Sequence, residues 1–463
     1  AYATIDNHKR GDYKPYVLKT ENRGRSWSLI SNNLPERGSA HTIIEDHVDP
    51  NLLFVGTEFG VFFSNNGGES WNELTSLPTI AVRDLEIQRR EGDLVVGTFG
   101  RGVYILDDIS PLRASSDELK QPTLFSVRDA WLYIPDSRRG WGGKGDFGVG
   151  RYTADNPPYG AVFAYYLPED LQSLKDKRRK DEQERAKKGE DNPYPSWDQL
   201  RREDREEAPS ITLTVRDASG NVMQRIAAPA GKGFHRVAWN MRYPAPDPVN
   251  LKPETDLAPW MSPPQGPLAL PGTYSVTMSK RVGGELVEIA SARSFELKPL
   301  FEGGLVTNDR QELLDFQMQS NDLYRAISGA NKARGEIQGR IDHLMKALQD
   351  TPASSEQQAQ ALRALNARMQ VLKVKFSGDS TISSRAEKVP MSLTSRINSI
   401  VGGHWDSQSA PTGNYRASYA IAEQQFSEAL VELKAIAADL AEFEAAVQAE
   451  GAPWTPGRIP DWP

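Results

Sequence analysis

The strongest constraint on the fold of this chain is an eight-residue pattern that occurs twice near its start. Thr20–Trp27 and Ser64–Trp71 agree position for position, 44 residues apart: a hydroxyl residue, Asn, Gly and Ser at every second position, then Trp. This composition is typical of a tight turn, because Asn bonds nearby backbone groups and Gly adopts positive φ without strain. Two copies at this spacing indicate a repeat architecture. The residues to which we assign structural roles in these octapeptide turns are Thr20, Asn22, Gly24, Trp27, Ser64, Asn66, Gly68 and Trp71.

The segments around the octapeptides repeat as well. The run VGTEFGV at 55–61 corresponds to VGTFGRGV at 96–103, with one inserted residue. Short β-rich runs between turn residues, recurring at about 40 to 45 residues, predict four-stranded propeller blades. The third copy has no octapeptide, so residues 1–109 supply two to three blades, whereas closed propellers have at least about four. We therefore expect another polypeptide, or a cleaved N-terminal half, to complete the ring.

The octapeptides resemble the Asp-box, or bacterial neuraminidase repeat, with Asn22 and Asn66 where that family usually has Asp. The wider run from 50 to 102 resembles large secreted bacterial proteins with sortilin-like propellers, which are often labelled glycosyl hydrolases by similarity alone. The resemblance implies a propeller, then a β-sandwich, then a helical segment. It also implies further blades before residue 1 and an extracytoplasmic location, whether periplasmic, cell-surface or secreted.

Residues 110–300 contain about seven short strand-like runs with hairpin turns between them, which predict an Ig-like β-sandwich. Trp239 alternates with Val237 and is expected in its core. Within 169–207, 24 of the 39 residues are charged. Such a segment cannot bury a face, so it is either an exposed helical excursion or a disordered insert.

The run Gly143–Gly148 matches the dinucleotide-binding pattern GxGxxG in letters only. That fingerprint requires a strand before it and a helix after it. Here Gly and Trp precede the run and two prolines follow it, so we interpret it as an irregular loop.

The C-terminal part of the chain carries apolar residues in steps of three and four, which predict long helices packed as a bundle over 301–450. The expected helices are 307–350, 356–377 and 414–448. Their expected buried positions are Leu323, Ile341, Phe426 and Leu440. The tail 451–463, rich in Pro and Trp, predicts an extended segment laid onto another domain. The chain as a whole is thus expected to be mainly β with a C-terminal α domain.

Composition excludes several classes of function. The net charge of −7 over 463 residues argues against binding to duplex nucleic acid, which needs a basic face. No run approaches the roughly 18 apolar residues of a membrane span. The absence of cysteine excludes disulfides and Cys-based catalysis or metal sites, and the six histidines lack zinc-binding spacing. We expect neither a metal nor a cofactor.

No catalytic centre is recognisable in the sequence. Arg83 and Arg101 are expected on inner strands with Glu58 nearby, which makes these three the candidate binding residues. A sialidase-type site needs three arginines, a Tyr/Glu pair and an acid on the face opposite the Asp-box turns, and these residues do not assemble one. We therefore predict no catalytic residue in this chain.

Two classes of function stay open. The chain is either a non-catalytic binding or scaffold protein, whose propeller engages a peptide, protein or glycan, or part of an exo-glycosidase. In the second case most catalytic residues would lie in the missing blades.

Overall fold

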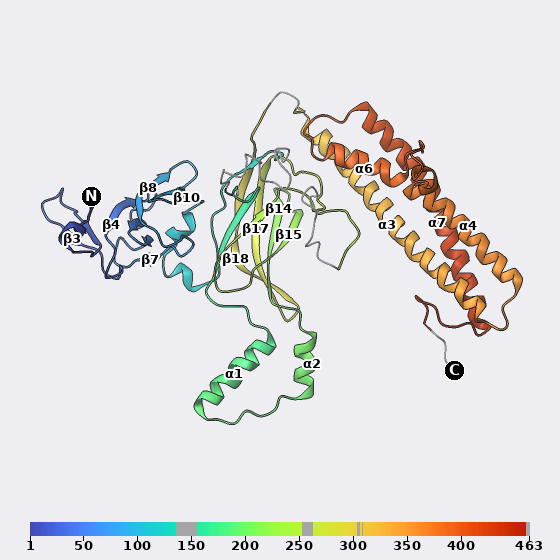
Figure 1. Ribbon diagram of the computed structural model, residues 1–463, viewed down its shortest axis with the longest axis horizontal. Coiled ribbons are helices and arrows are strands. Elements are labelled where there is room, and N and C mark those ends of the chain that lie inside the picture. Colours follow the sequence, from blue (N-terminus) through green and yellow to red (C-terminus); the bar gives the residue numbers. More distant parts are fainter. Residues whose placement is uncertain (136–153, 155, 252–262, 303–305, 308, 460–463) are drawn as a thin grey trace. The chain divides into compact units, whose positions relative to one another are not determined.

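The computed structural model describes residues 1–135, 154, 156–251, 263–302, 306–307 and 309–459 (Figure 1). The GxGxxG run at 143–148 lies outside these residues. The chain divides into two compact units. Unit 1 comprises 1–130, 156–240 and 272–297, and unit 2 comprises 131–155, 241–271 and 298–463. Unit 1 is rich in strands and unit 2 holds the long helices, so the expected C-terminal helical region is confirmed. The chain as a whole is mixed rather than mainly β, because the helices of unit 2 are long.

Unit 1 begins with three small antiparallel sheets. Sheet 1 has the order β1-β2-β3, with strands Tyr2–Ile5, Tyr16–Lys19 and Ser28–Leu29. Sheet 2 has the order β4-β5-β6-β7, with strands Ala40–Glu45, Leu53–Thr57, Gly60–Ser64 and Asn72–Glu73. Sheet 3 has the order β10-β9-β8, with strands Val103–Leu106, Asp93–Thr98 and Val82–Gln88.

Strand registers show which strands of the three sheets are equivalent. Lys19 and Phe63 are the residues directly before the two octapeptides. Lys19 pairs with Tyr2 in sheet 1, and Phe63 pairs with Phe54 in sheet 2. β1 and β2 therefore correspond to β5 and β6. In the described part of the chain, sheet 1 has no counterpart of β4, and sheet 3 has no counterpart of β7.

Both octapeptide turns are held by the same hydrogen bonds. In the second turn, Ser64 Oγ donates to Asn66 Oδ1 (2.7 Å) and accepts from the Gly68 amide (2.9 Å). Asn66 Oδ1 also accepts from the Ser70 amide at 3.0 Å. In the first turn, Thr20 Oγ1 donates to Asn22 Oδ1 (3.1 Å) and accepts from the Gly24 amide (2.9 Å). Asn22 Oδ1 accepts from the Ser26 amide at 2.9 Å. The octapeptide therefore encodes one local structure, fixed by its hydroxyl and amide side chains.

Sheet 2 is covered on both faces by its neighbours. Leu53, Val55, Phe62 and Trp71 pack against Val17 and Leu34 from residues preceding sheet 2. On its other face, Phe54 and Val61 join a second cluster with Val82, Leu85 and Val96 of sheet 3. The outer face of sheet 3 is open: Val103, the counterpart of Val61, is 65% exposed whereas Val61 is fully buried.

The strands that follow form two sheets that meet through aromatic side chains. One has the order β11-β13-β16, with strands Thr123–Leu124, Ala161–Leu167 and Gly233–Trp239. The other has the order β12-β18-β17-β14-β15, with strands Ala130–Leu132, Glu285–Pro299, Gly272–Val282, Ser210–Asp217 and Val222–Ala228. The ring of Phe163 in the first sheet packs edge to face against the ring of Phe295 in the second sheet. The ring centroids of Trp239 and Tyr274 are 5.4 Å apart. Trp239 is buried, as its alternation with Val237 predicted.

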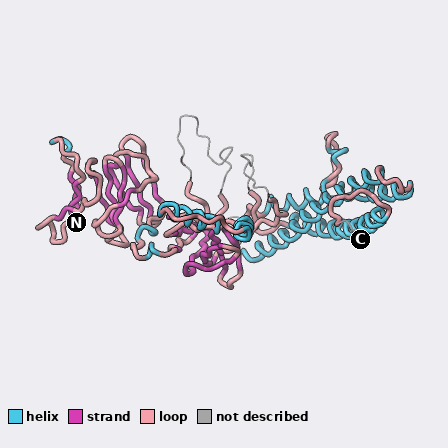
Figure 2. Tube along the Cα trace, turned by 90° about the horizontal axis from the view of Figure 1, so that it is seen from below, coloured by secondary structure: helices cyan, strands magenta, loops and turns pink. Residues whose placement is uncertain are grey.

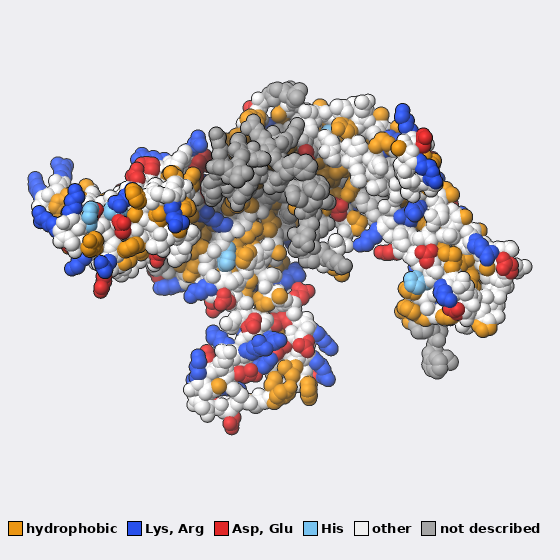
Figure 3. All heavy atoms as spheres, in the orientation of Figure 1, with side chains coloured by type: hydrophobic (Ala, Val, Ile, Leu, Met, Phe, Trp, Pro, Cys, Tyr) orange, Lys and Arg blue, Asp and Glu red, His pale blue; other side chains and the backbone are white. Residues whose placement is uncertain are grey.

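The charged insert forms a helical arm between β13 and β14. It consists of α1 (Leu174–Lys188) and α2 (Trp197–Arg205), so the helical alternative is confirmed. Arg178 joins the helices by donating to both carboxylate oxygens of Glu203, at 2.7 and 2.8 Å. Charged side chains of both signs cover the visible face of this arm, beside a small hydrophobic patch (Figure 3).

Unit 2 is built around long helices that run side by side (Figure 2). Its helices are α3 (Arg310–Gln349), α4 (Glu356–Ser377), α5 (Ser380–Ser383), α6 (Leu393–His404) and α7 (Gly413–Ala449). The ends of α3, α4 and α7 agree to within three residues with those of the helices predicted from the apolar steps. Leu323, Ile341, Phe426 and Leu440 are all buried in one common core, as expected.

Helix α6 was not predicted, because its twelve residues are too short to show a sustained apolar repeat.

The described part of the tail is non-helical and lies against α7, where Arg458 Nη1 donates to the Glu444 carbonyl at 3.2 Å. Trp454 fixes the turn of this tail by donating Nε1 to the Arg458 carbonyl at 2.8 Å.

Candidate functional site

Two β-bulges aim polar side chains into one hollow of unit 1. The pairing of β4 with β5 shifts between Ala40 and Thr42, and the pairing of β8 with β9 shifts between Val82 and Asp84. The extra residues are His41 and Arg83, which therefore occupy the same position of sheets 2 and 3. A bulge turns a side chain away from the regular alternation, which is why bulges are frequent beside functional sites.

The hydrogen bonds around His41 fix the tautomer of its ring. Arg83 Nη1 lies 3.2 Å from His41 Nδ1, and a guanidinium can only donate, so Nδ1 accepts. The proton then sits on Nε2, which lies 2.7 Å from Glu58 Oε2. Arg83 Nη2 also approaches the same Glu58 oxygen at 3.7 Å. Arg83, His41 and Glu58 form a closed triangle in which both ring nitrogens are occupied.

A second carboxylate lies on the other side of His41. Asp6 Oδ2 is 3.9 Å from His41 Nδ1, and the Asp6 carboxylate is 2.8 Å from His8 Nδ1. Burial alone would raise the pKa of Asp6, but hydrogen bonds from the amide and ring of His8 and from Ser39 outweigh it and lower this pKa to about 2. Asp6 is therefore ionised at any physiological pH.

These groups line a hollow of about 610 Å³, a size typical of small-molecule and peptide sites. We call it the His41 hollow. Arg37 stacks over the Tyr13 ring at 5.6 Å and Arg83 over the Phe99 ring at 5.5 Å, which holds both guanidinium groups in place. The lining residues are Asp6, His8, Tyr13, Arg37, Gly38, Ser39, His41, Glu58, Phe59 and Arg83.

Glycine is required at one point of the wall. Gly38 has φ of 123°, and a Cβ there would lie 2.8 Å from the ring of Phe59. The loop that carries Arg37 can therefore pass close to the β5–β6 turn only because residue 38 has no side chain.

In this arrangement neither ring nitrogen of His41 is left without a protein partner. A general base needs a free lone pair directed at its substrate, and both nitrogens of His41 are engaged by protein groups. Within the described ranges, no group of three or more His, Cys, Asp or Glu is placed to hold a metal ion. What the hollow offers a ligand is guanidinium groups, carboxylates and aromatic rings, several of them already fixed.

The structure brings together two of the three candidate binding residues. Glu58 and Arg83 line the His41 hollow, whereas Arg101 is exposed and does not line it. The expectation that Arg101 lies on an inner strand is wrong: it lies in the turn between β9 and β10. The inserted residue lengthens this turn, which relies on positive φ at Gly100 and Gly102.

Sequence reasoning missed the roles of His41 and Asp6. A full alignment of the three repeats could have found them, because it aligns His41 with Arg83 and Asp6 with Glu58 as equivalent positions. The signal was weak because the residue types differ at both positions.

The octapeptide residues lie away from the hollow. Strand β6 begins just after the turn that carries Glu58 and ends at Ser64, where the second octapeptide begins. The hollow and this turn are therefore at opposite ends of one strand. All hydrogen bonds of the octapeptides described above serve the turns themselves.

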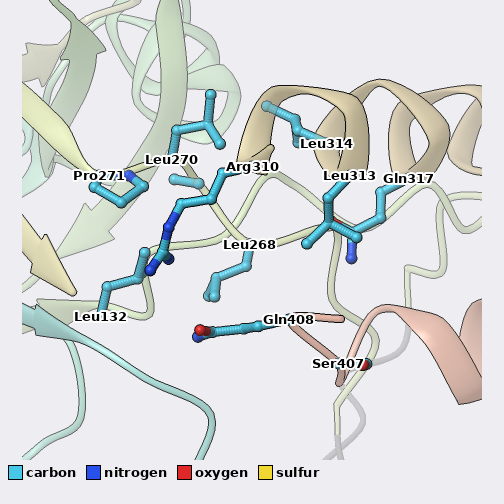
Figure 4. A pocket seen from close by; sticks show the side chains of 11 residues that line it. Leu132, Leu268, Leu270, Pro271, Arg310, Leu313, Leu314, Gln317, Ser407 and Gln408 are labelled. Atoms are coloured by element: carbon cyan, nitrogen blue, oxygen red, sulfur yellow. The ribbon is translucent and has the colours of Figure 1, made fainter. Parts of the chain in front are cut away.

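Unit 2 holds a small cavity of about 30 Å³ between Leu132, the 268–271 segment and α3 (Figure 4). This volume accommodates about one water molecule. Its walls are mostly apolar, and Gln317 at its side already donates Nε2 to the His404 carbonyl at 3.1 Å. We interpret it as a packing defect and not as a ligand site.

Comparison with known proteins gives little further information. No family model matches the chain, and no curated protein matches it. A solved structure of the extracellular domain of a one-component system from B. thetaiotaomicron aligns over 62% of this chain with 12% identity and a TM-score of 0.17. The aligned region spans 29% of that longer chain. A TM-score this low supports no conclusion about fold or function. No described helix combines the length and apolarity that a bilayer crossing requires.

Proposed function

We propose that this chain is a non-catalytic extracytoplasmic binding or scaffold protein, acting through a sortilin-like β-propeller that another chain or a cleaved N-terminal half completes. Under this proposal residues 1–109 are the C-terminal blades with two Asp-box turns. Residues 110–300 are an Ig-like sandwich, 301–450 a helical bundle and 451–463 an extended tail. The ligand is a peptide, protein or glycan that enters the His41 hollow.

The observation that carries the binding role is the closed triangle of Arg83, His41 and Glu58. Its members satisfy one another at 2.7 and 3.2 Å, so the protein holds them rigid without a ligand. Rigid polar groups lower the entropic cost of binding. The remaining N–H groups of Arg83, the other oxygen of Glu58 and the Arg37 guanidinium are available to a ligand.

The open faces of the outer sheets support completion by further blades. Trp71 of sheet 2 packs on residues before it, but its counterpart Trp27 in sheet 1 is 44% exposed. At the other end, Val103 and Ile105 of β10 are exposed, while the corresponding face of sheet 2 is covered by sheet 3. Contiguous apolar faces of this kind mark interfaces, and the equivalent faces of sheet 2 are covered by the neighbouring segments of the chain.

A second candidate function is exo-glycosidase activity. It is favoured by the two carboxylates, Asp6 and Glu58, which flank His41 in one hollow. Glycosidases generally use two carboxyl groups, one of them with a raised pKa as the general acid. The pKa of Asp6 is lowered instead, so Asp6 itself is not suited to act as that acid.

The test is a binding and turnover assay on the protein together with the polypeptide that completes it. A panel of sialosides, other glycosides and peptides is screened by calorimetry and by product release. The double variant Glu58→Ala/Arg83→Ala should weaken binding of the selected ligand at least about tenfold, because it removes charged hydrogen-bonding groups.

The matched control is Glu86→Ala/Arg89→Ala, which removes the same two charges from exposed positions that do not line the hollow. It should bind like the parent. Product release that disappears in the first variant and persists in the control would reject the non-catalytic proposal in favour of the glycosidase. Equal binding by both variants would move the ligand site away from this hollow.

A further inference from the structure

Strand β1 has an open edge where its counterparts are paired. β5 lies between β4 and β6, and β9 lies between β8 and β10. β1 pairs with β2 on one side only, among the residues that the structure describes. An unpaired edge presents free backbone N–H and C=O groups and is a ready template for another strand.

In sheets 2 and 3 the edge that is open in β1 is occupied by β4 and β8, and these two strands share a basic residue at the same position. Each carries a basic residue, His41 or Arg83, in its bulge. Each of these residues contacts the turn residue that follows the strand beside it. His41 binds Glu58 at 2.7 Å, and Arg83 stacks on Phe99 at 5.5 Å.

In sheet 1 the turn residue is Asp6, and the corresponding bulged residue is missing from the described chain. Asp6 instead interacts with His8, from its own loop, and lies 3.9 Å from His41 of the next sheet. Asp6 is ionised and its side chain is about one quarter exposed (27%), so it remains open to a further cation.

We propose that the polypeptide completing the ring adds a strand antiparallel to β1, and that a basic residue in a bulge of this strand lies against Asp6. The inference rests on the proposed ring completion and extends it. The incoming strand would then contribute a side chain to the His41 hollow, so the ligand site is complete only in the assembly.

The register of the repeats dictates the experiment. Because Ala1 corresponds to Leu53, a copy of residues 39–52 placed directly before Ala1 would reach β1 as β4 reaches β5. Two forms of the extended full chain are compared, with Arg or Glu at the copy's counterpart of His41. Each is also made with Asp6→Asn. Hydrogen exchange of the amides of Tyr2–Ile5 reports whether β1 has gained a neighbour.

With Arg in the copy, the edge amides of β1 should exchange at least about tenfold more slowly than in the unextended chain. The Glu form should show about fivefold less protection than the Arg form, since like charges across a bulge repel. Asp6→Asn should abolish this difference, because it removes the charge that distinguishes Arg from Glu.

Each result supports or rejects a separate statement. Unchanged exchange at β1 in all forms would reject strand addition at this edge. Protection that is equal for Arg and Glu would reject the ion pair with Asp6 while leaving strand addition standing. Neither result depends on the ligand panel, so a failure here is distinct from a failure of the proposed binding function.

Discussion

Trp71 and Trp27 occupy the same position of two matching turns, yet Trp71 is 3% exposed and Trp27 is 44% exposed. The difference comes from the neighbours. Trp71 packs against Val17 and Leu34 and donates its Nε1 proton to the Ile30 carbonyl at 2.7 Å. No equivalent cover reaches Trp27 in the described chain. The pair is therefore a natural comparison between a covered and an uncovered repeat.

Replacing Trp71 by Ala should lower the free energy of unfolding of the N-terminal sheets by about 3–5 kcal/mol, because it leaves a large cavity and an unpaired carbonyl. Trp27→Ala, the matched control, should cost less than about 1 kcal/mol in the isolated chain. Urea denaturation followed by tryptophan fluorescence measures both. Similar losses in the two variants would show that Trp27 is already covered in solution.

The helical core offers a second comparison of this kind. Leu440 is fully buried among α3, α4 and α7, whereas Val431 on the same helix is 71% exposed. Leu440→Asp should destabilise unit 2 by several kcal/mol, because it buries an unpaired charge. Val431→Asp should change stability by about 0.5 kcal/mol or less. The check is thermal unfolding followed by circular dichroism at 222 nm, and equal melting of the Leu440 variant and the parent would contradict the assignment.

His404 makes the stability of unit 2 depend on pH. The side chain is 2% exposed, and neither ring nitrogen has a hydrogen-bond partner in the described chain. Burial, and then the charge of Arg416, lower its pKa below the usual value. The unfolded chain therefore takes up this proton more readily than the folded one. The contribution of His404 to stability should therefore be fully present above about pH 7.5 and should be lost as the pH drops through about 6.5, by at most about 1.4 kcal/mol per pH unit.

The measurement is the urea midpoint of unit 2 between pH 8 and pH 5, with His404→Leu and His343→Gln as the variants. His404→Leu should flatten the decline, whatever its effect on stability at pH 8. His343 is exposed, so its replacement should leave the decline unchanged. A parent protein with the same midpoint at pH 8 and pH 5.5 would rule out this role of His404.

An ion pair between Arg178 and Glu203 links the two helices of the arm. The side chain of Glu203 is only 3% exposed, and hydrogen bonds from Arg178 lower its pKa. Arg178→Ala should release α2 from α1 and speed cleavage of the arm by trypsin at its many other basic sites. Arg179→Ala, which removes a neighbouring exposed arginine, should be cleaved at the rate of the parent. If both variants are cut equally, the pair does not hold the arm.

Much of the fold could be predicted because its signals are local. The hydrogen bonds of the octapeptide turns run between residues two and four apart, and the apolar steps of α3 and α7 are visible over ten turns. Local signals do not depend on knowing which strands meet. The charged insert was also recognisable, since its many charges left only the choice between helix and disorder.

The site could be predicted only in part, because it depends on contacts between sheets. His41 and Arg83 meet from strands 42 residues apart, and both are aimed by bulges, which a strict alternation of inward and outward residues does not anticipate. Arg101 was misplaced for a related reason. One inserted residue moved it from the expected strand into a turn.

The two units alternate along the chain, and this has a consequence for synthesis. Residues 131–155 and 241–271 belong to unit 2, while 272–297, which contain most of β17 and β18, return to unit 1. During translation the central five-stranded sheet cannot close until the end of β18 at Pro299 has left the ribosome, long after the N-terminal sheets have emerged. The early intermediate would expose strand edges for many seconds at ribosomal speeds of about 5–20 residues per second. Such a nascent chain is a natural client for a holding chaperone, and no single truncation point separates one unit from the other.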